Sequence, residues 1–267
     1  MNTLKITISF LIIYFNFQYC YSQNQIDSSK YDCQTVTQII NSDTLIKKIC
    51  TERKSIIFRE GKNYVYDALI IDKNNDTISD SKVTFIGTNK RAEFAPQSQM
   101  LIQIIFERSK QDSIELHKIS NNQTCCVWYD TILEGIIENV DRVWIHPIRS
   151  NQFILNETAG FPDVRLPLEI NKEWSSTMNI MGWGDWKNSI FKNSYKVISK
   201  KKYLLNNEEL LCWEVECYTN FRGEINKHTF LFNEQYGFVE MKYNYQNGLK
   251  IIFNMIKCIM EDQKKSK

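Results

Sequence analysis

The feature that most constrains the fold of this chain is the succession of strand-like runs between Tyr203 and Glu261. Alternating apolar and polar residues recur there in short stretches, which are separated only by turn-forming pairs: Asn206-Asn207, Arg222-Gly223, Tyr236-Gly237 and Asn247-Gly248. The Asn-Gly pair between two alternating runs favours a type I′ hairpin, in which both central residues need a positive φ. The pattern predicts an antiparallel β-meander.

The alternation within the meander predicts which side chains are buried. In two of the runs, one face is apolar and the other is mixed, as expected when an antiparallel sheet packs one side on a core. The apolar sets are Leu211, Trp213, Val215 and Cys217 in one run and Val239, Met241, Tyr243 and Tyr245 in another. The last run, 249–260, is apolar on both sides, which predicts a central strand or one that is covered on both faces.

The first half of the chain repeats this pattern and then changes period. Strands are predicted at 55–60, 63–72, 83–87, 100–108 and 113–119. From Asp130 to Val143 the apolar residues follow helical spacing, with Asp130 as a candidate N-cap. The predicted fold class is mainly β (α+β): a curved antiparallel β-meander or half-barrel packed on one principal helix.

The N-terminus predicts export. Residues 1–22 have the form of a secretory signal peptide, with Lys5 before an apolar stretch and small residues at 20–22. The apolar stretch is shorter than the roughly 20 residues of a membrane-spanning helix, so we expect no transmembrane segment in the mature chain and a periplasmic or surface location. A lipid anchor on Cys20 is the less favoured alternative, because Phe17-Gln18-Tyr19 lacks the small residues of such a site.

The mature chain divides by composition. Residues 23–54 form a polar N-terminal segment, 55–261 a single β-rich domain, and 262–267 a tail that we expect to be disordered. The alternative is two sub-sheets, 55–128 and 170–261, joined by the helix at 130–143. A net charge of +2 with 24% charged residues, and no basic patch with interleaved aromatics, predicts no nucleic-acid partner.

Cysteine usage fits an exported protein. Removal of Cys20 from the eight cysteines leaves seven, an odd number, so at least one is unpaired or pairs between chains. Cys33 and Cys50 flank a short segment and are the candidate disulfide. No CxxC occurs, and His117, His146 and His228 lack ligand-like spacing, so we expect no metal and no cofactor.

The segment from Val143 to Trp186 is the least regular. It holds three of the four prolines and four of the six tryptophans. Exposed on loops, such aromatics form a binding surface; buried, they close the end of a barrel or sheet, which is the favoured interpretation. Trp183 and Trp186, with His146 and Arg149, are the candidate interaction residues.

This segment also carries a resemblance. Its motifs and those that follow are Ile145-His146-Pro147-x-Arg149, Gly160-Phe161-Pro162, Leu166-Pro167-Leu168, Lys172-Glu173-Trp174, Tyr195-Lys196-Val197, Cys212-Trp213-Glu214-Val215 and Tyr236-Gly237-Phe238-Val239. In this order they resemble exported proteins of unknown function of flavobacteria-like bacteria. More remotely, they are similar to envelope proteins with a lipoprotein-carrier-like half-barrel. The resemblance implies an envelope location and an apolar cleft inside a curved sheet, and brings no catalytic residues.

No enzyme signature is present. The chain lacks a GxSxG elbow, an HExxH motif and a phosphate-cradling glycine loop. His146 is the strongest single catalytic candidate, but a histidine hydrogen-bonded to a loop carbonyl is the commoner situation. Arg149 and Arg165 could clamp an anionic ligand or brace the proline-rich loops.

Three functions are therefore ranked for an exported, non-enzymatic chain. The first is binding of an apolar ligand or lipid on a concave face formed by Trp213, Val215, Val239, Met241 and Tyr243. The second is a protein-interaction module of the envelope that uses the Trp-rich loop 174–186. A hydrolase is third.

Overall fold

The computed structural model describes residues 31–40, 43–52, 56–92, 99–107, 128–180 and 189–260. The elements in these ranges are β1 (Tyr31–Ile40), β2 (Asp43–Glu52), β3 (Lys62–Ile71), β4 (Thr77–Arg91), β5 (Met100–Phe106), β6 (Thr131–Glu138), β7 (Arg142–Ile145), the 3₁₀ helix η1 (Asn151–Thr158), β8 (Asp163–Arg165), β9 (Glu173–Ile180), β10 (Ser189–Leu205), β11 (Glu208–Phe221), β12 (Glu224–Asn233), β13 (Gly237–Asn244) and β14 (Lys250–Met260). The signal-peptide prediction at 1–22, the strand at 113–119 and the tail at 262–267 lie outside the described residues.

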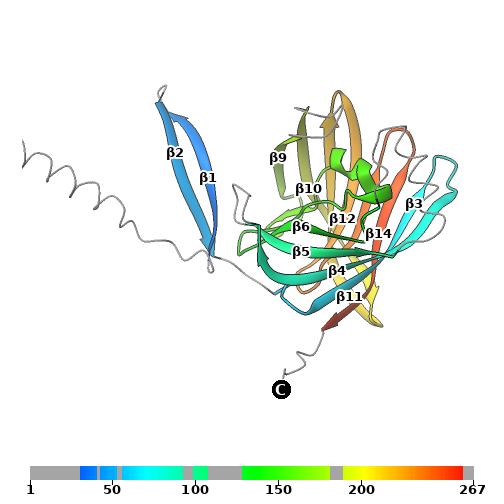
Figure 1. Cartoon of the computed structure of the whole chain (residues 1–267). Coiled ribbons are helices and arrows are strands. Elements are labelled where there is room, and N and C mark those ends of the chain that lie inside the picture. The colour runs from blue at the N-terminus through cyan, green and yellow to red at the C-terminus, as the bar shows by residue number, and fades with distance from the viewer. Residues whose placement is uncertain are drawn as a thin grey trace, which may run out of the picture.

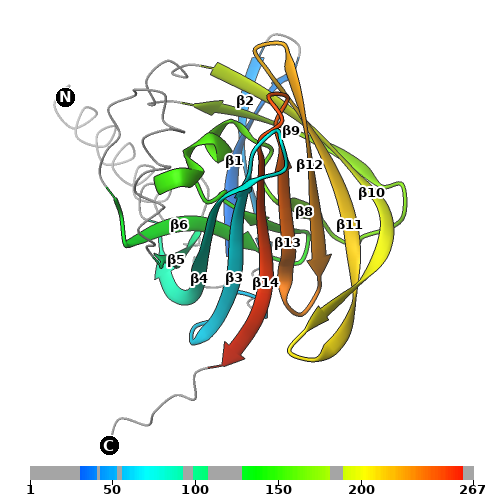
Figure 2. The same cartoon turned by 90° about the vertical axis from the view of Figure 1, so that its right-hand side faces the viewer.

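Twelve strands form one antiparallel sheet in the order β8-β7-β6-β5-β4-β3-β14-β13-β12-β11-β10-β9. Neighbours in the sheet are neighbours in the chain except where β14 pairs with β3, Phe253 lying opposite Ala68. This pairing joins the two halves of the chain into one sheet, where two sub-sheets had been the alternative. The sheet curls into a nearly closed barrel (Figures 1 and 2), which confirms the predicted mainly-β, curved meander.

The predicted helix at 130–143 is wrong. These residues form β6 and β7, which pair directly with Ile136 opposite Ile145, and the main-chain N–H of Asn139 donates to Arg142 O across the connecting turn at 2.9 Å. Short apolar runs do not separate a buried strand from a helix by periodicity alone. Partner strands on both sides, β5 and β7, decide the conformation, and the helix in the described residues is instead η1.

The turns follow the predicted positions but not the predicted types. At Asn247-Gly248 only the glycine of the pair has a positive φ, 86°, and Tyr245 N donates to Leu249 O at 2.9 Å around a three-residue loop. The two-residue turns with both φ values positive are Asn206-Asn207, at 51° and 65°, and Arg222-Gly223, at 51° and 88°. The type I′ prediction was therefore placed on the wrong pair, because the loop length selects the turn type.

Large side chains fill the concave side of the sheet. Those less than 2% exposed include Tyr64, Tyr66, Phe85, Phe153, Phe230, Phe232, Phe238, Tyr243 and Phe253. The prediction of a central last strand is confirmed, because β14 lies between β3 and β13 and buries Ile251, Phe253 and Met255. Ile256 on the same strand is 42% exposed, so the cover on its other face is incomplete.

One end of the barrel is closed by a short bend after β2. Residues 56–58, which were predicted as part of a strand, form this bend, and Glu138 of β6 holds it. The carboxylate accepts main-chain hydrogen bonds from Ile56 at 2.7 Å, Ile57 at 2.8 Å and Phe58 at 2.9 Å. A carboxylate that satisfies three consecutive N–H groups replaces the strand partner that the bend lacks.

β1 and β2 form a separate two-stranded hairpin that stands away from the barrel (Figure 1). The main-chain N–H of Val140 donates to Glu52 O at 3.3 Å at the base of this hairpin. The register places Cys33 opposite Cys50, which are the two cysteines of the predicted disulfide. The disulfide itself stays a prediction. Among the described residues, no helix has the length and apolar character needed to span a bilayer.

Candidate functional site

The chain between β7 and β8 passes through the inside of the barrel, and we name residues 146–162 the plug. After His146 it runs from Pro147 through η1 to Pro162, and neither proline can donate to a strand ladder. Asn151 starts η1 with φ 57° and exchanges two hydrogen bonds of 2.9 Å with the main chain of Tyr129. Local polar bonds, rather than sheet pairing, thus shape the plug.

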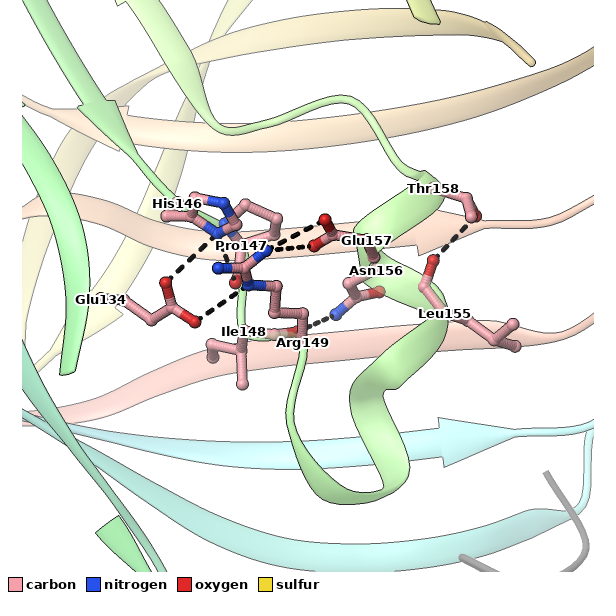
Figure 3. Close-up of polar contacts among 9 residues, drawn as sticks. All are labelled: Glu134, His146, Pro147, Ile148, Arg149, Leu155, Asn156, Glu157 and Thr158. Atoms are coloured by element: carbon pink, nitrogen blue, oxygen red, sulfur yellow. Dashed lines mark hydrogen bonds and ion pairs between the residues drawn. The ribbon is translucent and has the colours of Figure 1, made fainter. Parts of the chain in front are cut away.

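An ionic cluster ties the plug to the sheet. Arg149 lies between Glu134 of β6 and Glu157 of η1 (Figure 3), with Nε 3.1 Å from Glu134 Oε1 and Nη1 2.8 Å from Glu157 Oε2. The side chains of Glu134 and Glu157 are 8% and 7% exposed. One guanidinium therefore faces two buried carboxylates, which leaves an excess of negative charge when both acids are ionised.

Burial dominates the electrostatics of this cluster. It raises the pKa of Glu134 to about 7, against the opposing effect of Arg149. It also raises the pKa of Glu157, again with Arg149 opposing. A carboxyl group with a pKa near 7 exchanges its proton in the physiological range, so the charge of the cluster changes with pH.

His146 lies at the start of the plug beside Glu134. Its Nδ1 is 3.4 Å from Glu134 Oε2 and 3.3 Å from Pro147 O, and its ring packs on Phe161 with centroids 4.6 Å apart. Burial, with the nearby Arg149, lowers the pKa of His146 to about 3. The imidazole is therefore neutral, and a proton on Nδ1 fits the two acceptor oxygens beside it.

The plug contacts the concave wall through a few aromatic and polar interactions. Phe153 packs on Phe253 with ring centroids 5.0 Å apart. Tyr245 Oη donates to Asn156 Oδ1 at 2.7 Å. Tyr195 Oη donates to Phe161 O at 3.0 Å.

The closest approach between plug and wall is at Gly160. A Cβ on this residue would lie 2.2 Å from Cys217 Sγ and 2.7 Å from Thr219 Oγ1. Any larger residue would therefore push the plug off the wall.

Buried polar atoms remain unpaired where plug and wall meet. Among the described residues, Gln152 Oε1 of the plug and both ring nitrogens of His228 have no hydrogen-bond partner. His228 is fully buried, its pKa is lowered to about 3 by burial, and it lies opposite Cys217 on β11 and Tyr243 on β13. An unpaired buried polar atom costs about 1–3 kcal/mol, so this contact is weaker than its burial suggests.

The residues predicted to line a ligand face come together in part. Val215, Val239, Met241 and Tyr243 are buried in the core cluster of the barrel. Trp213 is only partly buried and lines an open groove of about 330 Å³ with Lys200 and Gln235, where Lys200 Nζ lies 3.9 Å from the centre of its ring. Whether the set binds a ligand stays a prediction.

The structure describes two of the four predicted interaction residues. His146 and Arg149 belong to the plug, whereas Trp183 and Trp186 lie outside the described residues. Trp174, at the start of the same Trp-rich segment, stacks on Tyr195 in β10 with ring centroids 5.4 Å apart. Arg165, the second candidate anion clamp, lies with its Nε 3.7 Å from Asp163 Oδ1, and Asp163 also accepts two hydrogen bonds from Arg142.

Sequence reasoning missed Glu134, Glu157 and His228. Glu134 falls within the predicted helix at 130–143, of which only the apolar residues were expected to face the core, whereas the observed strand β6 turns Glu134 into the barrel. His228 had a usable signal, because it alternates with Phe230 and Phe232 on an otherwise apolar strand face. Glu157 had none, since only the tertiary structure brings it to Arg149.

We name the ionic cluster of Glu134, Arg149 and Glu157 the latch. A cavity at the closed end of the barrel measures about 20 Å³ and is lined by Ile57, Glu138, Val143 and Phe232, among others. That volume holds about one water. Within the residues that the structure describes, no group of three or more His, Cys, Asp or Glu is placed to hold a metal ion.

Comparisons with known proteins give distant structural matches. No protein-family model and no curated protein matches the chain. A solved protein of Parabacteroides distasonis described as a lipoprotein is 9% identical, with 76% of this chain and 97% of that one covered and a TM-score of 0.44. A protein of Bacteroides fragilis described as exported, with a YmcC-like fold, is 8% identical, with 76% and 98% covered and a TM-score of 0.39. The Escherichia coli hypothetical lipoprotein YmcC is 8% identical, with 79% and 92% covered and a TM-score of 0.33.

Proposed function

We propose that this chain is an exported, non-catalytic binding protein of the bacterial envelope that takes an apolar ligand on the concave wall when the plug moves aside. Export is inferred from the signal-like sequence of residues 1–22. The kinship with exported proteins of flavobacteria-like bacteria is proposed from the motifs between Ile145 and Val239. The ligand class rests on the wall, whose buried aromatic and aliphatic side chains form one core cluster together with Ile148, Phe153 and Ala159 of the plug.

The observation that carries this proposal is the mismatch between wall and plug. The wall is apolar, whereas five of the eight residues of η1 are buried polar side chains: Asn151, Gln152, Asn156, Glu157 and Thr158. Gln152 Oε1 and His228 remain unpaired across this contact. An apolar ligand would bury no polar groups against the apolar wall, as the plug does. The polar side chains of the plug would be hydrated again once the plug has moved out.

The latch supports a movable plug. Of the two ion pairs of Arg149, the one with Glu134 ties the plug to the sheet, while the one with Glu157 lies within the plug. Loss of a single ion pair thus removes the charged link between plug and sheet, and such local links set the free energy of local opening.

The first experiment is native mass spectrometry of the mature protein purified from its own envelope, followed by organic extraction. We expect a co-purifying lipid or other apolar molecule at fixed stoichiometry. A bare protein mass, together with no saturable binding of the fluorescent apolar probe N-phenyl-1-naphthylamine, would overturn the proposal.

A variant pair tests the plug directly. Gly160→Val forces the plug off Cys217 and Thr219, so we expect the affinity for the probe to rise at least about tenfold while the far-UV spectrum stays that of a β protein. Gly223→Val is the matched control, because Gly223 has φ 88° and nothing within 4 Å of a Cβ. It introduces comparable strain far from the plug. An equal rise in both variants, or none in folded Gly160→Val, contradicts the proposal.

A further inference from the structure

We propose that two copies of this chain associate by strand addition, in which β1 of one copy pairs with the free edge of β9 in the other. The inference rests on two unpaired strand edges and is independent of the plug. It assigns both a surface and its partner, which is a second copy of the same chain.

The free edge of β9 is the first observation. In the part of the chain that the structure describes, β9 ends the sheet and pairs with β10 alone. Its eight residues pair in unbroken register, from Glu173 opposite Lys196 to Ile180 opposite Ser189. Natural edge strands are usually guarded by lysine, proline, a bulge or short length. β9 has no proline, lysine or bulge, and its charged residue is Glu173 at the first position.

The other edge of the sheet shows the contrast. β8 has only three residues, and Pro167 follows it two residues later. A strand that short offers little template for another chain. One edge of the barrel sheet is therefore protected and the other is open for pairing.

The hairpin is the second observation. β1 and β2 have ten residues each and pair with each other over their full length, in a sheet separate from the barrel. An isolated two-stranded hairpin is at best marginally stable in water, so a third strand is needed. β2 carries Lys47 and Lys48 at its centre, whereas residues 33–40 of β1 carry no charge. The unguarded strand of the hairpin is thus β1.

The position of the hairpin indicates a second copy. Its base is fixed to the β6–β7 turn by the hydrogen bond from Val140 N to Glu52 O. From there the hairpin extends away from the barrel of its own chain (Figure 1). If β1 of each copy pairs with β9 of the other, the free edges of both strands are hydrogen-bonded in both copies. The result is a closed dimer with two-fold symmetry.

Native mass spectrometry and hydrogen exchange of the full mature chain test this proposal. We expect a dimer that dissociates on dilution. In the dimer, alternate amides of β9 and β1 should exchange at least about tenfold more slowly than in the diluted monomer, because alternate N–H groups point to the newly paired edge. A monomer at all concentrations up to about 100 µM overturns the proposal, and so does a dimer without this protection.

Two proline variants provide the matched pair. Ser176→Pro and Thr177→Pro lie on adjacent residues, whose N–H groups point to opposite edges of β9. One proline removes an N–H that bonds to β10, which should lower the melting temperature of the monomer. The other removes an N–H on the free edge of β9, which should leave the melting temperature of the monomer unchanged and weaken dimerisation at least about tenfold. Unchanged dimerisation of this variant overturns the proposal. If both variants unfold, hydrogen exchange of the wild-type dimer decides: slowed exchange of alternate β9 and β1 amides supports the proposal, and unchanged exchange overturns it.

Discussion

Glu134 and Glu138 lie on the same face of β6, four residues apart, yet they hold two different segments in different ways. Glu138 accepts hydrogen bonds from three main-chain N–H groups of the bend at 56–58. Glu134 shares Arg149 with Glu157 of the plug. Burial raises the pKa of both carboxyl groups, that of Glu134 to about 7.

The difference lies in the donors. Main-chain amides are neutral and fixed, so the contact of Glu138 persists as long as the bend does. The cluster at Glu134 holds two acids and one base in a buried place, and its energy depends on which acid is protonated. The bend at 56–58 is therefore held by neutral main-chain donors, whereas the plug is held by an ion-pair cluster that contains two acids and one base.

Removal of the Glu138 carboxylate should have the largest effect. Glu138→Ala leaves three N–H groups of the bend without their acceptor, and we expect a loss of about 4 kcal/mol in the free energy of unfolding. Urea denaturation at pH 5 and at pH 8 measures the loss. Glu209→Ala is the control, since the exposed pair of Glu209 with Lys202 contributes less than about 1 kcal/mol. A loss for Glu138→Ala no greater than that of the control would refute the fixed contact.

Arg149→Met should have the next largest effect on stability, and the size of this effect should depend on pH. At pH 8 it leaves two buried carboxylates without a cation, and we expect a loss of about 3 kcal/mol. At pH 5 Glu134, whose pKa is raised to about 7, is protonated, and the loss should be smaller. The same urea titrations measure both values, and an equal loss at the two pH values would contradict a titrating latch.

Glu134→Gln isolates the titration itself. The folded pKa of about 7 lies above the ordinary value of 4.5, so the folded chain binds more protons between these values. The stability that this group contributes is therefore present at low pH and is lost as pH rises from 4.5 through 7. We expect the variant to be about 2 kcal/mol more stable than wild type at pH 8 and nearly equal at pH 4. A wild-type minus variant difference that does not change with pH would refute this.

The smallest effect is expected at His228, where the wall meets the plug. His228→Phe removes two unpaired ring nitrogens and should add about 1 kcal/mol of stability at pH 7. The folded pKa of about 3 lies below the ordinary 6.5, so wild type loses stability as pH falls through this range. The gain should therefore grow towards pH 4. Thermal denaturation over pH 4–8 measures it, and a destabilised variant would show that the imidazole has a partner.

Much of the fold could be predicted from local pattern. The meander between 203 and 260, the buried face with Val239, Met241 and Tyr243, and the central position of β14 all follow from period-two alternation and turn residues. The helix at 130–143 failed because a run such as Ile132, Ile136 and Val140 fits either period. That one error also hid the site, since Glu134 faces the barrel only when β6 is a strand.

The sequence by itself determined that the chain alternates, turns and folds into a curved antiparallel sheet, because side-chain direction and positive-φ turns are local properties. Only the tertiary structure decided what fills the barrel. Arg149 meets Glu134 and Glu157, and Gly160 meets Cys217, through contacts between segments that no spacing relates. Burial then shifts the pKa of the carboxyl groups, and burial is a property of the assembled barrel.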